Sequence, residues 1–163
     1  MRARGIALVT ACVSAAVSAS LAAQGASAHH PAAAHPKATR EVRVQIVSGT
    51  PQSAHAYVAP AAPKYVTEFT RPLVVRVEGA RNPKLGVRFS CITPDCELPP
   101  QVQPDEVKRI DPRTFEAQSK DGKATISLIV STATPRTVEV VAEPLAGPGE
   151  RAVRSAPFRL TAE

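Results

Sequence analysis

The sequence predicts an all-β protein, a two-sheet antiparallel β-sandwich that follows an N-terminal export segment. Apolar and polar residues alternate in six segments, which gives each predicted strand one apolar face and one mostly polar face. Residues typical of turns, namely Pro, Gly, Asn and Asp, separate these segments. No stretch of ten or more residues after residue 40 has a helical period. Short strands with frequent turns therefore favour a sandwich over a helical or mixed fold.

The N-terminal region has the three parts of a secretory signal peptide, and we expect it to span residues 1–28. Arg2 and Arg4 form a basic start, residues 5–23 are small and apolar, and Ala26-Ser27-Ala28 offers a cleavage site. The alternative is a membrane-anchor helix, but serines dilute the apolar stretch and no basic cluster follows it. We therefore predict a periplasmic or secreted protein without a transmembrane segment after cleavage.

The mature chain is expected to consist of a short linker and one domain. Residues 29–40, HHPAAAHPKATR, have no period that could bury a face, and we predict a disordered Ala/Pro/His linker. The domain is expected over residues 41–163. Removal of 28 from 163 residues leaves 135, which is enough for a single core. Loss of two of the 20 basic residues leaves 18 against 14 acidic ones, a net charge of +4.

The predicted strands follow one another with clear punctuation. The first ends at Ser48-Gly49-Thr50-Pro51, and Asn82-Pro83-Lys84-Leu85-Gly86 joins the second to the third. Asp121-Gly122 is a hairpin signal just before the fourth. Residues Gln103–Ile110 favour one short helical turn. The apolar faces are expected to consist of Val42, Val44 and Ile46; Leu73, Val75 and Val77; Val87, Phe89 and Cys91; Ala124, Ile126, Leu128 and Val130; Val138, Val140 and Ala142; and Phe158 and Leu160.

Five pieces of the chain occur in an order and spacing known from one domain family. They are Val47-Ser48-Gly49-Thr50-Pro51-Gln52-Ser53, Pro72-Leu73-Val74-Val75-Arg76-Val77, Asn82-Pro83 followed by Gly86-Val87 and Phe89, Asp121-Gly122-Lys123-Ala124-Thr125-Ile126, and Val138-Glu139-Val140-Val141-Ala142. Together they resemble the bacterial immunoglobulin-like domains of invasin and intimin. The resemblance covers roughly residues 42–143, and it implies an immunoglobulin-like sandwich.

The chain contains three cysteines, of which Cys91 and Cys96 lie in the predicted domain. A cysteine pair in an exported protein is expected to form a disulfide. Four residues intervene, unlike the C-x-x-C of redox pairs, and two sulfurs without nearby histidines suit zinc poorly. We predict a structural staple worth about 2 kcal/mol in the chain-entropy model. The third residue, Cys12, offers an alternative lipid anchor through the loose lipoprotein box Val9–Cys12.

The four histidines, His29, His30, His35 and His55, all precede residue 56. Cleavage after Ala28 would expose His29 as the N-terminal residue, whose amine and ring can bind copper with a second histidine. A copper-binding protein is therefore the alternative function. The other interpretation is a flexible tail without a cofactor, and the Pro/Ala-rich surroundings favour it.

The motifs of common enzyme classes are missing from the sequence. No G-x-S-x-G elbow or reactive cysteine accompanies His55, and no Gly-rich phosphate loop is present. We therefore predict that the chain is not an enzyme. Arg76 and Arg88 are expected on outward faces of different sheets, and no aromatic residues are interleaved with them, so nucleic acid is not an expected partner.

Residues 53–68, SAHAYVAPAAPKYVTE, form a long segment that is the first candidate binding surface. Its Tyr57 and Tyr65 form either an aromatic binding loop at one end of the sandwich or an edge that covers the core margin. Taken together, the sequence predicts an exported, non-catalytic interaction or structural module of the bacterial envelope. Its partner is expected to be a protein or a cell-surface polymer.

Overall fold

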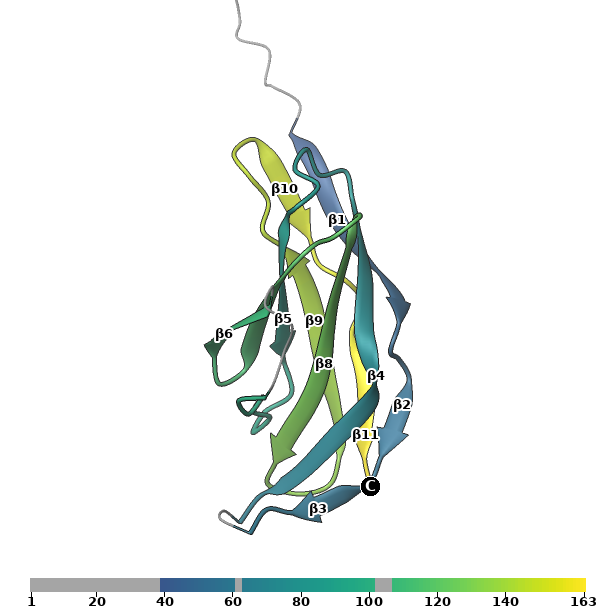
Figure 1. Ribbon diagram of the computed structural model, residues 1–163, viewed down its shortest axis with the longest axis vertical. Helices are drawn as coiled ribbons and strands as arrows, with labels where there is room; N and C mark the ends of the chain where they lie inside the picture. The colour runs from purple at the N-terminus through teal and green to yellow at the C-terminus, as the bar shows by residue number, and fades with distance from the viewer. Residues whose placement is uncertain (1–38, 61–62, 102–106) are drawn as a thin grey trace, which may run out of the picture. The chain divides into compact units, whose positions relative to one another are not determined.

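The computed structural model describes residues 39–60, 63–101 and 107–163, which form two packed β-sheets (Figure 1). No helix occurs within these ranges, and so none of membrane-spanning length. The predicted all-β sandwich is confirmed. The strands are β1 (Arg40–Ser48), β2 (Gln52–Ala54), β3 (Ala56–Val58), β4 (Tyr65–Glu78), β5 (Gly86–Cys91), β6 (Val107–Asp111), β7 (Thr114–Gln118), β8 (Lys123–Thr132), β9 (Thr137–Pro144), β10 (Glu150–Val153) and β11 (Phe158–Ala162).

The first sheet, called sheet A, is built around the long strand β4. Strand β8 pairs antiparallel along most of β4, whereas β1 pairs with its C-terminal half and β3 with its N-terminal half. Strand β10 extends the sheet by a parallel pairing with β1. A register shift between Phe69 and Leu73 separates the two halves of β4. Strands β1, β3 and β8 therefore share β4 as their common partner, and the sheet is not a simple meander.

The second sheet, called sheet B, has the order β2-β11-β9-β5-β7-β6. Its pairings are antiparallel except for the one between β2 and β11, which is parallel. Strands β1, β4 and β8 occupy the places of A, B and E in an immunoglobulin domain, and β5, β9 and β11 those of C, F and G. The fold is thus an immunoglobulin-like sandwich, whose chain crosses from sheet A to sheet B between β1 and β2.

The core lies between the sheets and consists of the alternating apolar residues. Most residues predicted to face inward are buried, and Ile46 and Val77 pack against them while partly exposed. Phe89 of β5 and Phe158 of β11 place their ring centroids 6.4 Å apart, so aromatic bulk fills the centre of sheet B. Burying a side chain of this size stabilises the fold by about 1.5–3 kcal/mol.

The predicted disulfide is present between Cys91, the last residue of β5, and Cys96. Their Cα atoms are 6.2 Å apart, within the usual range, and both residues are buried in the core. The segment that follows lies beside β8, because Glu97 and Ser131 exchange two backbone hydrogen bonds. The disulfide therefore fixes the start of a segment that covers part of the β8 edge.

The short helical turn predicted at Gln103–Ile110 is wrong where the structure describes it. Residues from Val107 onward belong to β6, which pairs antiparallel with β7 at the edge of sheet B. The Arg109 Nε atom also donates to the Leu98 carbonyl oxygen at 3.0 Å. Cross-strand pairing with β7 thus overrides the weak local preference of this segment for a helical turn. Residues 103–106 of the predicted turn lie outside the described part of the chain.

Candidate functional site

The two predicted tyrosines lie on opposite faces of the hairpin formed by β3 and β4. Tyr57 pairs with Val66 and faces outward with 49% exposure, whereas Tyr65 shares the inward side with buried Phe69 and is partly buried. In the register, Tyr57 lies opposite Val66, which is the neighbour of Tyr65 in β4. Neighbouring residues of a strand point to opposite sides, so the two rings lie on different faces of the sheet. Tyr65 therefore lies at the core margin, and Tyr57 is the exposed aromatic residue of this segment.

The predicted histidines do not meet in the described part of the chain. His55 is exposed between β2 and β3, while His29, His30 and His35 lie outside the described residues. Among the described residues, no three His, Cys, Asp or Glu side chains are close enough to hold a metal ion.

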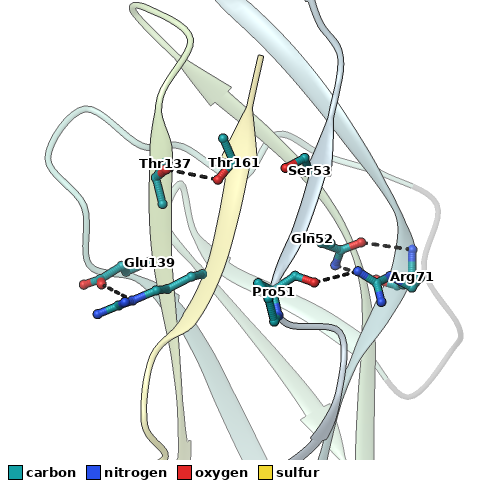
Figure 2. A pocket seen from close by; sticks show the side chains of 8 residues that line it. Pro51, Gln52, Ser53, Arg71, Thr137, Glu139 and Thr161 are labelled. Atoms are coloured by element: carbon teal, nitrogen blue, oxygen red, sulfur yellow. Dashed lines mark hydrogen bonds and ion pairs between the residues drawn. The ribbon is translucent and has the colours of Figure 1, made fainter.

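The outer face of sheet B contains an open depression of about 690 Å³ near its β2 edge (Figure 2). Three neighbouring strands supply most of its lining. The register places Ser53 of β2 beside Thr161 of β11, and Thr161 beside Thr137 of β9. The complete lining is Pro51, Gln52, Ser53, Arg71, Thr137, Glu139, Arg159 and Thr161. Hydrogen-bonding side chains from β2, β9 and β11 therefore project from a rigid sheet.

Two side-chain pairs bridge β9 and β11 within this face. The Thr137 and Thr161 hydroxyl oxygens are 3.0 Å apart and share a hydrogen bond. The Arg159 Nε atom lies 3.3 Å from a carboxylate oxygen of Glu139 in an exposed ion pair. Each pair joins residues that are direct partners in the register, so the pairing of the strands fixes their spacing.

Arg71 reaches the depression from the other sheet and is held there by Gln52. Its guanidinium donates to the Pro51 carbonyl oxygen at 2.6 Å (Figure 2). The buried Gln52 amide donates to the carbonyl oxygens of Gly49 and Arg71 at 2.8 and 3.0 Å, and accepts from the Arg71 backbone N–H at 3.3 Å. One side chain thus ties β2 to the bulged region of β4 and sets the position of Arg71.

The arrangement of the depression suits recognition by hydrogen bonds and charge. Arg71 has no acidic partner within ion-pair distance among the described residues, so its guanidinium can donate to an anionic or carbonyl group. The two threonine hydroxyls bond to each other across the strands, so both are held in place beside Arg159 and Glu139. Among the described residues, the site therefore offers a guanidinium without an acidic partner, two hydroxyls that bond to each other and the ion pair of Arg159 with Glu139.

Sequence reasoning found Ser53 as part of the candidate segment but missed the other residues of the depression. Glu139 and Arg159 stand at alternate polar positions of predicted strands, and Thr137 and Thr161 continue that alternation by one residue, which is a visible signal for outward side chains. Periodicity does not say which strands are neighbours, so it could not bring these residues together.

No protein-family model matches the sequence, and no curated protein matches it significantly.

Proposed function

We propose that this chain is an exported, non-catalytic interaction module of the bacterial envelope. It binds a protein or a cell-surface polymer at the depression on sheet B. The observation that carries the proposal is the set of hydrogen-bonded side chains around the Arg71 guanidinium, which has no acidic partner among the described residues. Rigid strands limit the entropy lost when a partner binds, so such a face suits recognition.

The export part of the proposal rests on the signal-peptide pattern of residues 1–28 and on the cysteine pair. A buried disulfide between Cys91 and Cys96 suits an oxidising compartment outside the cytoplasm. We further propose kinship with the invasin and intimin type of domain. The sequence resemblance and the immunoglobulin-like strand order support this proposal.

The binding face can be tested by photo-crosslinking in living cells. A photoreactive amino acid is introduced at Thr161 in the depression or, as the control, at exposed Lys108 on β6, at the opposite edge of sheet B. We expect a defined envelope adduct from position 161 only. Arg71→Ala and Arg159→Ala should each reduce its yield, because they remove donors from the depression.

Two results would contradict the proposal. Equal adduct yields from both positions would mean that the protein contacts its surroundings indiscriminately. An adduct yield from position 161 that neither arginine variant changes would mean that recognition occurs outside the depression. N-terminal sequencing of the exported protein tests compartment independently, and we expect His29 as its first residue. A full-length cytoplasmic product would reject export.

A further inference from the structure

Two like charges stand directly opposite each other on the outer face of sheet A. Arg76 of β4 and Lys123 of β8 are Cα partners in the antiparallel register, and both are exposed. Like charges in this arrangement destabilise a sheet slightly. On the other side of Arg76, its partner in β1 is the uncharged Gln45. This row of sheet A therefore has a repulsive pair and no acidic residue.

Two acidic residues near this row, Glu78 and Glu41, contact side chains other than Arg76 and Lys123. Glu78, two residues from Arg76, accepts a hydrogen bond from the Gln45 amide at 3.0 Å. Glu41 forms an ion pair with Arg43 on its own strand. Within the described residues, neither Arg76 nor Lys123 makes an ion pair. The repulsion is thus left without a local counter-charge in contact.

The basic row continues around the end of the sandwich. Lys120 is the bridge partner of Lys123 across the tight turn at Asp121-Gly122, where both turn residues have positive φ. Lys120 also lines a cavity of about 540 Å³ together with Lys84, and both lysines are exposed. We call Arg76, Lys84, Lys120 and Lys123 the basic corner. Asp121, also exposed, is the one acidic residue that lines this cavity.

We propose that the basic corner binds a linear, phosphate-bearing polyanion. Four neighbouring cations suit a chain of repeated negative charges better than they suit one isolated anion. Three of the four are lysines, whose compact ammonium groups act as point charges and respond to charge density, and a phosphate chain carries its charges more closely spaced than a uronate chain does. None of the large exposed apolar residues of the described chain, Val47, Tyr57, Val58, Ile92 and Ile110, lies in the segments 83–84 and 118–123 that carry the three lysines. A soluble chain is therefore favoured over insertion into a membrane.

The proposal predicts that binding and stability change in opposite directions. The protein is expressed from its complete sequence, and short-chain inorganic polyphosphate is titrated into it at low salt. Arg76→Gln with Lys123→Gln should weaken binding about tenfold, because each exposed ion pair contributes up to about fivefold. The same variant should raise the unfolding temperature by about 1–2 °C, since the repulsion is gone. Lys123→Glu should raise it further and weaken binding at least as much.

The matched control is Arg88→Gln on sheet B, which removes one positive charge and is compared with Lys123→Gln alone on sheet A. Arg88 lies between Glu116 and Glu143 in the register, and its Nε atom is 3.5 Å from a Glu116 carboxylate oxygen. This variant should change the affinity less than twofold and should not raise the unfolding temperature. An equal loss of binding in Arg88→Gln would show that net charge alone attracts the polyanion, and it would overturn the proposal.

Other polyanions test the ligand class. Polygalacturonate carries carboxylates instead of phosphates, and we expect it to bind at least fivefold more weakly than polyphosphate of matched charge. Equal affinity for the two chains, or binding to anionic vesicles without binding to polyphosphate, would reject the phosphate-chain proposal. The basic corner is separate from the depression on sheet B, so these results do not depend on the photo-crosslinking outcome.

Discussion

One row of outward residues on sheet B and one on sheet A differ in the signs of the charges that face each other across neighbouring strands. On sheet B, Arg88 is flanked by Glu143 on β9 and Glu116 on β7, and Glu116 is followed by Lys108 on β6. Charges therefore alternate in sign across four strands. On sheet A, the corresponding row reads Gln45, Arg76, Lys123, and its two charges have the same sign. The charges of this sheet B row are thus compensated and those of this sheet A row are not, although Arg43 and Glu78 form an opposite-charge pair in the next outward row of sheet A.

This difference distinguishes charged residues that stabilise the fold through cross-strand pairs from charged residues that remain available to bind a partner. Alternating cross-strand pairs contribute roughly 0.2–1 kcal/mol each, so the sheet B row needs no ligand to explain it. A like-charge pair costs stability in the free protein and is relieved when an anion binds. The depression on sheet B contains one arginine of each kind. Arg159 is paired with Glu139, whereas the Arg71 guanidinium donates to a backbone carbonyl oxygen.

The largest expected effect comes from Gly49, where the chain passes from β1 in sheet A to β2 in sheet B. Gly49 has a φ of 99°, and an added Cβ atom would lie 2.6 Å from the Pro72 carbonyl oxygen. Gly49→Ala should lower the free energy of unfolding by about 3 kcal/mol, through backbone strain and overpacking together. Chemical denaturation measures this loss, which should disturb both faces because the crossing joins them.

Gly149→Ala is the matched control for that substitution. Gly149 also has positive φ, at 74°, but an added Cβ atom would meet no atom within 4 Å. It should cost only the backbone term of about 1 kcal/mol. Equal losses in the two variants would mean that the close approach to Pro72 is unimportant.

Gln52→Leu should have the second largest effect and should act on the depression. The change keeps the size of the side chain but leaves the Gly49 and Arg71 backbone groups without their buried partner. We expect a loss of about 2 kcal/mol in unfolding free energy. The photo-crosslink from position 161 should also weaken, because Arg71 is no longer positioned. The exposed Gln45→Leu is the control, and a comparable loss there would contradict the bracing role of Gln52.

The comparison of the two rows can be measured directly by two double-mutant cycles. One cycle combines Arg76→Ala with Lys123→Ala, and the other combines Arg88→Ala with Glu116→Ala. We expect coupling energies of opposite sign, repulsive in sheet A and attractive in sheet B, each about 0.3–0.5 kcal/mol at low salt. Both should shrink at 1 M salt, where the Debye length is about 3 Å. Couplings of the same sign would remove the distinction between the faces.

The fold could be predicted from the sequence because its main strands repeat an apolar residue at every second position. All six alternating segments lie in strands, and Arg76 and Arg88 lie on different sheets as predicted. Strands β6 and β7 were missed, the former because its segment favoured a helical turn. The short strands β2, β3 and β10 were missed because three or four residues are too few to establish a period. Their pairing instead depends on distant contacts, such as the hydrogen bond from the Ala56 N–H to the Glu163 carbonyl oxygen at 2.6 Å.

The sites were less predictable than the fold, because they depend on which strands are neighbours. The parallel pairing of β2 with β11 places Ser53 beside Thr161, and no local pattern indicates that arrangement. Arg71 joins them through a bulge in β4 and through Gln52, a residue that the sequence offered only as part of a family resemblance. Likewise, the opposition of Arg76 and Lys123 follows from register, which a one-residue slip would destroy.

The smallest expected effect concerns the Ala/Pro/His linker, residues 29–40, which we expect to contribute neither to the depression on sheet B nor to the basic corner. The first strand begins at Arg40, so a mature protein truncated before Lys37 should keep its unfolding temperature, its photo-crosslink and its polyphosphate affinity. Calorimetry with copper on the native, truncated and N-terminally extended proteins tests the alternative function. Coordination by the amine and ring of His29 would require a free N-terminus, and it would weaken as the pH falls through about 6.5, where an imidazole becomes protonated. We expect weak binding that one added N-terminal residue does not change. Tight stoichiometric binding that such an extension abolishes would instead make copper binding a function of this chain.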